Sequence, residues 1–170
     1  ADRPIVVAGD AVFWSDAAAE LQEFVELFQC PVHTRRMARG AVPENYPLSF
    51  TGGNRQPLLD HADVILLLGL QASQLEEWFE PPVWNQEAQY IQVHEAPEAF
   101  FVAPPTEVGI VGCTKLVLRQ FIDFAKDHPE LEFEVTAIGC GLAGYKPCQI
   151  APMFCDAPKN CCLPAEFMHE

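Results

Sequence analysis

The feature that most constrains the fold is a short apolar run at residues 62–69, which reads Ala-Asp-Val-Ile-Leu-Leu-Leu-Gly. Val64 to Leu68 are all apolar and lack the alternation of a half-exposed strand, so a strand here must be covered on both faces. A buried helix is the alternative, but the run is short and lies between Asp63 and Gly69. The run therefore predicts a central strand of a parallel sheet, with helices on both sides.

The flanking segments alternate between strand-like and helix-like patterns. Ile5–Ala8 predicts a first strand, and apolar residues at helical spacing between Leu21 and Phe28 predict a helix, which Ser15 is placed to cap. Further strands are expected at 30–34, 89–93 and 108–111, and further helical segments near 56–61, 71–79 and 116–127. Such alternation predicts an α/β fold, a three-layer sandwich with a mainly parallel sheet.

Size and charge narrow the class of protein. The chain has 170 residues and a formal net charge of −14, which fits one domain and argues against a nucleic-acid partner, since phosphate binding needs clustered Lys and Arg. It shows no apolar run of membrane-spanning length and no signal-like start. We therefore expect a cytoplasmic protein with no membrane partner.

The cysteines form no recognisable framework. There are seven, at positions 30, 113, 140, 148, 155, 161 and 162, and an odd number without secretory signals predicts free thiols. A metal or thiol site from Cys148, Cys155, Cys161 or Cys162 with His169 nearby is the alternative. No CxxC pair is present, and two adjacent cysteines rarely bind one tetrahedral ion, so no metal site is predicted.

Candidate ligand-binding residues follow two predicted strands. Gly9 and Asp10 form the turn after the first strand, and Arg35 and Arg36 follow the second. In open α/β sheets, ligands bind outside the carboxyl ends of the strands, which makes these residues candidates for holding a phosphate or another anion. A solvated basic loop is an equally good interpretation of the arginines.

A second candidate lies near the C-terminus. Residues 131–138 (LEFEVTAI) predict a strand, which runs into Gly139, Gly141 and Gly144 in a GxGxxG pattern. Such glycines let backbone N–H groups approach a phosphate at the start of a helix. A tight turn that merely needs small residues is the favoured alternative, because Pro152 leaves room for only a short helix.

Five segments, in order, resemble one known family. They are RPIVVAGDA, CPVHTRRMARGAVPENYPLSF, ADVILLLG, YIQVHEAPEAF and VGIVGCTKLVLRQFI. Residues 3–125 thereby resemble the central domain of thiamine diphosphate-dependent enzymes of the acetolactate synthase, oxalyl-CoA decarboxylase and benzaldehyde lyase group. The resemblance implies a Rossmann-like sheet of six parallel strands that packs between two thiamine-binding domains. Some family members hold FAD or ADP in this domain, and many hold nothing.

The chain also departs from that family. The GDG and NN motifs that hold the metal and diphosphate belong to the family's flanking domains and do not occur in this sequence, so thiamine diphosphate is not expected as a cofactor. After the YIQV segment it has His94-Glu95-Ala96-Pro97 instead of a D-x-D-P pattern, which leaves only Glu95 to contact a ribose. We therefore expect no catalytic residues, and ADP or FAD is only a possibility by resemblance.

The C-terminal part resembles a different group. Residues 121–167 are similar to an uncharacterised bacterial family with the signature IGCGLAGY. The two resemblances meet in one helix, which suggests a natural or engineered chimera whose residues 126–170 complete the sheet of a single 1–170 domain. The expected function is a non-catalytic Rossmann-like domain, packed against flanking thiamine-binding domains or against itself. A binding module for an adenine nucleotide or phosphate is the first alternative, and a cysteine-based site is the second.

Overall fold

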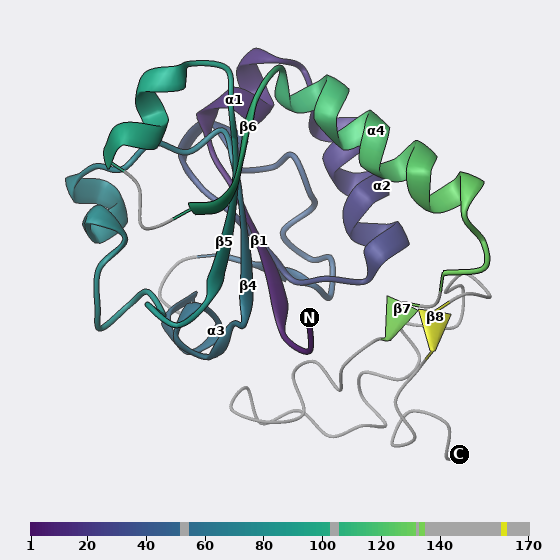
Figure 1. Cartoon of the computed structure of the whole chain (residues 1–170), viewed down its shortest axis with the longest axis horizontal. Coiled ribbons are helices and arrows are strands. Elements are labelled where there is room, and N and C mark those ends of the chain that lie inside the picture. The colour runs from purple at the N-terminus through teal and green to yellow at the C-terminus, as the bar shows by residue number, and fades with distance from the viewer. Residues whose placement is uncertain (52–54, 103–105, 132, 135–160, 163–170) are drawn as a thin grey trace.

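The computed structural model is built around one six-stranded sheet (Figure 1). It describes residues 1–51, 55–102, 106–131, 133–134 and 161–162. All neighbouring strands of this sheet are parallel, in the order β3-β2-β1-β4-β5-β6. The strands are β1 (Pro4–Ala8), β2 (Val32–Thr34), β3 (Ser49–Phe50), β4 (Val64–Leu68), β5 (Gln89–His94) and β6 (Thr106–Val111). The predicted α/β class with its Rossmann-like parallel sheet is confirmed.

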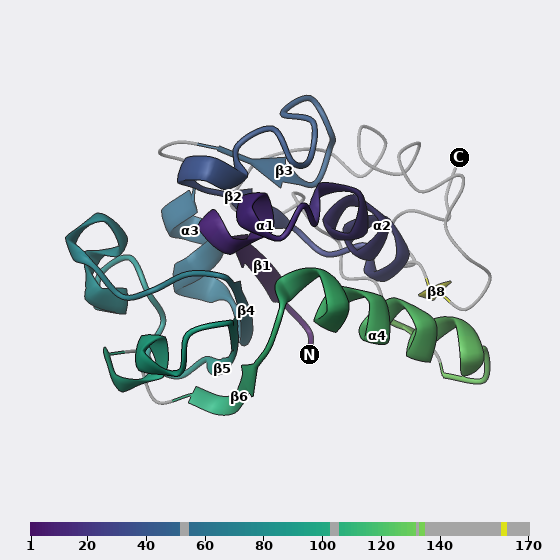
Figure 2. The same ribbon diagram turned by 90° about the horizontal axis from the view of Figure 1, so that it is seen from above.

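Helices cover both faces of the sheet. The α-helices are α1 (Asp10–Trp14), α2 (Ala18–Phe28), α3 (Arg55–His61) and α4 (Thr114–Asp127), and the 3-10 helices are η1 (Arg36–Ala38), η3 (Gln74–Phe79) and η4 (Pro97–Val102). Figure 2 shows α2 and α4 side by side, and α3 lies across the sheet from them. Within the described ranges, none of the helices is long and apolar enough to cross a membrane.

Strand β4 lies in the interior of the sheet, as its unbroken apolar run predicts. It pairs with β1 on one side and β5 on the other. Leu66 and Leu68 enter the core under α2 and α4, whereas Ile65 and Leu67 enter the core that Phe79 helps to close. Both faces of β4 are thus shielded from water, which is why its sequence does not alternate between apolar and polar residues.

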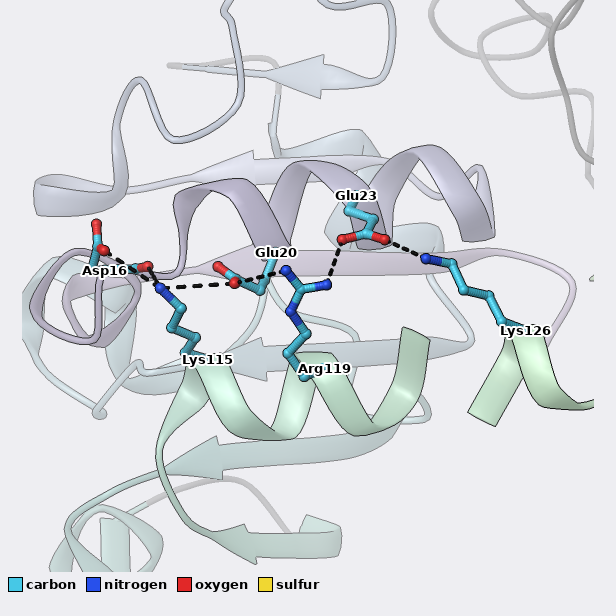
Figure 3. A network of polar contacts seen from close by, with 6 residues as sticks. All are labelled: Asp16, Glu20, Glu23, Lys115, Arg119 and Lys126. Carbon is cyan, nitrogen blue, oxygen red and sulfur yellow. Dashed lines mark hydrogen bonds and ion pairs between the residues drawn. The ribbon is translucent and has the colours of Figure 1, made fainter. Parts of the chain in front are cut away.

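Helices α2 and α4 are joined by a row of ion pairs (Figure 3). Three acidic side chains come from α2 and the turn before it, and three basic ones from α4: Asp16, Glu20, Glu23, Lys115, Arg119 and Lys126. The acidic and basic residues are about a hundred positions apart in sequence. The row fixes the two helices relative to one another along their shared face.

Two local predictions were wrong. Ser15 does not cap α2, because the turn of α1 continues to it and its hydroxyl donates to Ala11 O at 2.6 Å. Glu20 lies off the apolar stripe that the sequence predicts for this helix, but it is 4% exposed because α4 packs over it and supplies Arg119 as a partner, 3.3 Å away. The short strand β3 also lies within residues 40–57, a segment whose glycines and prolines predict an irregular connection.

The C-terminal prediction is corrected in its described part. Phe133–Glu134 form β7, which pairs with β8 (Cys161–Cys162) in a separate two-stranded sheet and does not extend the main one. Pairing with β8 satisfies the backbone N–H and C=O groups of β7, which were expected to form hydrogen bonds with the six-stranded sheet. Residues 132 and 135–138 of that predicted strand and the glycines Gly139, Gly141 and Gly144 lie outside the described residues.

Candidate functional site

The topology places one candidate site at the carboxyl edge, the edge formed by the C-terminal ends of the parallel strands. The chain runs outward from β1 through β2 to β3, then returns to β4 on the other side of β1. The connections from β1 and β4 therefore leave in opposite directions, which is where open α/β sheets bind ligands. Gly9 and Gly69 directly follow these two strands at this switch point.

The two glycines are needed for close packing of the chain on itself. A Cβ atom on Gly9 would lie 2.5 Å from Leu70 Cγ, and one on Gly69 would lie 2.2 Å from Ala11 Cβ. Gly69 also has a φ of +63°, which a side chain would strain. The N–H of Gly9 donates to Leu68 O at 2.8 Å, so the backbone here binds backbone. Gly9 thus has a structural role at the predicted site.

The fold brings Asp10 and Arg36 close together, as a shared ligand site would require. The two side chains form an ion pair with each other. Arg36 Nη2 lies 3.1 Å from Asp10 Oδ2, and the Met37 N–H donates to Asp10 Oδ1 at 3.1 Å. Asp10 begins α1 and Arg36 begins η1, so the pair joins the loops after β1 and β2. The Arg36 side chain remains 47% exposed, which leaves part of its guanidinium open to solvent.

Arg35 points to a different partner. Its Nη2 donates to Leu75 O at 2.5 Å, and its Nε lies 3.6 Å from Glu76 Oε1. The Glu76 side chain is fully buried, and Ser73 Oγ donates to its other carboxylate oxygen. Among the described residues, Arg35 Nη1 is buried and has no hydrogen-bond partner. The arginine that sequence reasoning offered to a ligand is therefore held by the protein itself.

Glu76 is the residue that sequence reasoning missed. It lies in η3, in a segment that was expected to form only a helical turn, and it is 0% exposed. No local pattern marks it, because its partner Arg35 is 41 residues earlier in the chain. Glu95, the residue suggested for a ribose, follows β5 and is exposed.

Cys30 and Cys113 do not form a reactive centre together. Cys30 is buried, and loss of hydration raises the pKa of its thiol to about 12. Cys113 is half-buried at the start of α4. In the part of the chain that the structure describes, no three His, Cys, Asp or Glu side chains form a group that could hold a metal ion. Cys148, Cys155 and His169 lie outside it.

Comparisons with known proteins agree on one family. The model of the "thiamine pyrophosphate enzyme, central domain" family matches residues 1–121. A 2-hydroxyacyl-CoA lyase from Oryza sativa subsp. japonica is 33% identical over 129 residues, which are 76% of this chain and 22% of that protein. An oxalyl-CoA decarboxylase from Escherichia coli K12 is 31% identical over 112 residues, 66% of this chain and 20% of that protein.

The solved structures show the same fold. A benzoylformate decarboxylase from Polynucleobacter necessarius superposes with a TM-score of 0.59 at 21% identity, covering 71% of this chain and 24% of that one. The chain spans about a fifth of the length of the two curated relatives named above.

Proposed function

The chain belongs to the central-domain family of thiamine pyrophosphate enzymes, and we propose that it serves as a non-catalytic, structural domain without thiamine chemistry of its own. The observation behind this proposal is the pairing of charges at the carboxyl edge. Arg35 is engaged by Glu76, and Arg36 by Asp10. Side chains that neutralise one another tie loops together, whereas a ligand site keeps groups ready for the ligand.

Thiamine diphosphate provides the direct test. The sequence lacks the GDG and NN motifs through which the family binds this cofactor, so we expect no heat of binding when the cofactor and Mg²⁺ are titrated into the protein. We also expect no turnover of pyruvate, benzoylformate or oxalyl-CoA. A measured dissociation constant in the micromolar range, or any turnover above that of a heat-treated sample, would reject the proposal.

Flanking thiamine-binding domains are the partners that we propose, in a soluble cytoplasmic enzyme. Support comes from large apolar side chains that are exposed in the segments following β1, β2 and β4: Phe13, Trp14, Met37, Leu75 and Trp78. Apolar side chains gathered on one side of a domain mark interaction surfaces. The isolated chain should then self-associate in sedimentation velocity. Trp14→Ser should reduce this association, and Phe124→Ser, on α4, should not.

An adenine nucleotide or another phosphate ligand, such as ADP or FAD, is the second candidate. The switch point between β1 and β4 and the exposure of Arg36 favour it. The ligand would contact Gly9, Asp10, Arg35 and Arg36, together with the glycines Gly139, Gly141 and Gly144. It would first have to break the existing ion pairs, which is why we rank this function second.

A thermal-shift screen with ADP, FAD, NAD, ADP-ribose and zinc separates the candidates. A ligand at 100 times its dissociation constant stabilises the fold by about 2.7 kcal/mol, an easily measured shift. If a nucleotide stabilises the protein and Arg36→Met abolishes this stabilisation, the second candidate is supported. Stabilisation by zinc alone would support a site in the C-terminal cysteines.

The C-terminal residues 126–170 lie beyond the family match, which ends at residue 121. We propose that they belong to the same domain although they derive from a second family, as in a chimera. Cutting the chain after Asp127 should then yield a molten or aggregating remnant. Cooperative unfolding at an unchanged urea midpoint would instead make the tail an appendage.

A further inference from the structure

Residues 71–80, here called the strap, follow β4 and contain η3. Three consecutive residues of the strap, Glu77, Trp78 and Phe79, have φ values of +47°, +53° and +59°, and none is glycine. Side chains disfavour this left-handed region, and a run of three such residues persists only where surrounding contacts enforce it. The strap also exposes Leu75 and Trp78, by 58% and 52%, so apolar burial does not hold its middle in place.

Both ends of the strap are fastened to the body of the domain. Just before the strap, the buried Gln92 donates from Nε2 to Leu70 O at 3.1 Å. At its far end, Gln86 Nε2 donates to Phe79 O at 2.9 Å. The Phe79 ring packs edge-on against Trp84, with centroids 4.7 Å apart, and both rings are buried. These contacts involve no charge and are independent of the middle of the strap.

The middle of the strap is held by Arg35. Its Nη2 binds Leu75 O, and its Nε faces the buried carboxylate of Glu76. Arg35 follows β2, and β1 separates β2 from β4 in the sheet, so this contact connects the strap to a strand that is not its neighbour. A buried carboxylate is costly without a cation beside it, and Arg35 is the cation that the structure pairs with Glu76.

We propose that the strap is a latched element: the Arg35–Glu76 pair holds its strained middle against the carboxyl edge, and loss of the pair opens residues 73–78 locally. The two fastened ends and the six-stranded sheet remain in place. Opening relieves the left-handed backbone of Glu77 and Trp78 and hydrates Glu76. It also frees the Arg35 guanidinium at the carboxyl edge, so that the edge changes from a neutral, closed state to one with an unpaired cation.

Hydrogen exchange measured by NMR tests the latch. The amides of Glu76 and Trp78 both donate to Ser73 O, at 3.1 and 3.0 Å, and they report on the closed strap. In Glu76→Gln these amides should exchange on the order of a hundredfold faster, while the amides of β1 and β4 keep their protection. Glu44→Gln is the matched control, because Glu44 pairs with Arg39 at 2.9 Å on the exposed surface. It should leave the exchange of the strap unchanged.

Arg35→Lys is the second variant. Lysine keeps the positive charge but cannot reach Leu75 O and Glu76 with the same fork of N–H groups, so the strap should open to a smaller extent. The latch is rejected if the strap amides in both variants match those of the unsubstituted protein. It is also rejected if strap and strand amides accelerate equally, or if Glu76→Gln fails to fold, since the pair would then hold the whole domain together.

Discussion

Truncation of Leu67 to alanine tests the central place of β4. The Leu67 side chain is 0% exposed and lies in the core with Ile5, Val7 and Tyr90. Buried Leu→Ala changes cost about 2–5 kcal/mol, and the cost is highest where the surroundings cannot collapse into the cavity. Because β4 is hydrogen-bonded to a strand on each side, its backbone cannot move to close the gap. We therefore expect a loss of about 3–5 kcal/mol in the free energy of unfolding.

Urea unfolding followed by circular dichroism measures this loss. Leu116→Ala is the control, because Leu116 is 64% exposed on α4 and its truncation should change the free energy of unfolding by less than about 0.5 kcal/mol. A typical domain has only about 5–15 kcal/mol of stability, so Leu67→Ala should shift the midpoint clearly. A loss below about 1 kcal/mol with an unchanged m-value would show that β4 is not the rigid centre of the sheet.

Three further predictions concern single side chains. The hydrogen bond from Lys126 lowers the pKa of Glu23. The Glu23 carboxylate therefore stabilises the fold above about pH 4.3, and this contribution is lost as the pH falls through the folded pKa. Lys126→Ala should reduce this loss of stability between pH 7 and pH 3, measured by urea unfolding at each pH. With a pKa of about 12, Cys30 should resist iodoacetamide at pH 8 in the native protein, whereas peptide mapping in denaturant should find all seven cysteines modified without prior reduction. Gly69→Ala combines a φ of +63° with a 2.2 Å approach to Ala11 Cβ, and should cost about 2–4 kcal/mol in thermal unfolding; an unchanged midpoint would contradict the described turn.

The sequence predicts the sheet well because the relevant signals are local. The run at Val64–Leu68 is apolar at every position because the strand is buried on both faces, and this pattern can be read from the strand's own sequence. The turn at Gly9–Asp10 and the basic residues after β2 also follow strand ends, so their gathering at one edge follows from parallel topology. These predictions needed no knowledge of which helix packs on which face.

The partners of charged residues were beyond the reach of local patterns. Glu20 lies off the apolar stripe that the sequence predicts for α2, yet it is buried because α4 packs over it and places Arg119 beside it. Arg35 looked like an anion ligand, and its carboxylate partner Glu76 comes from a segment whose apolar and acidic residues show no clear period. In each case, the deciding contact joins residues that are distant in sequence, so only the assembled fold reveals it.

The charges at the carboxyl edge favour the proposed structural role over a ligand site. Arg35 and Arg36 are matched by Glu76 and Asp10, two cations by two carboxylates, in a chain whose net charge is −14. An anion would have to separate one of these ion pairs before it could bind Arg35 or Arg36. The same pairs join the loops after β1 and β2 and tie β2 to the strap. Under the proposed structural role, these pairs hold the loops of the domain together at the edge where sheets of this topology bind ligands.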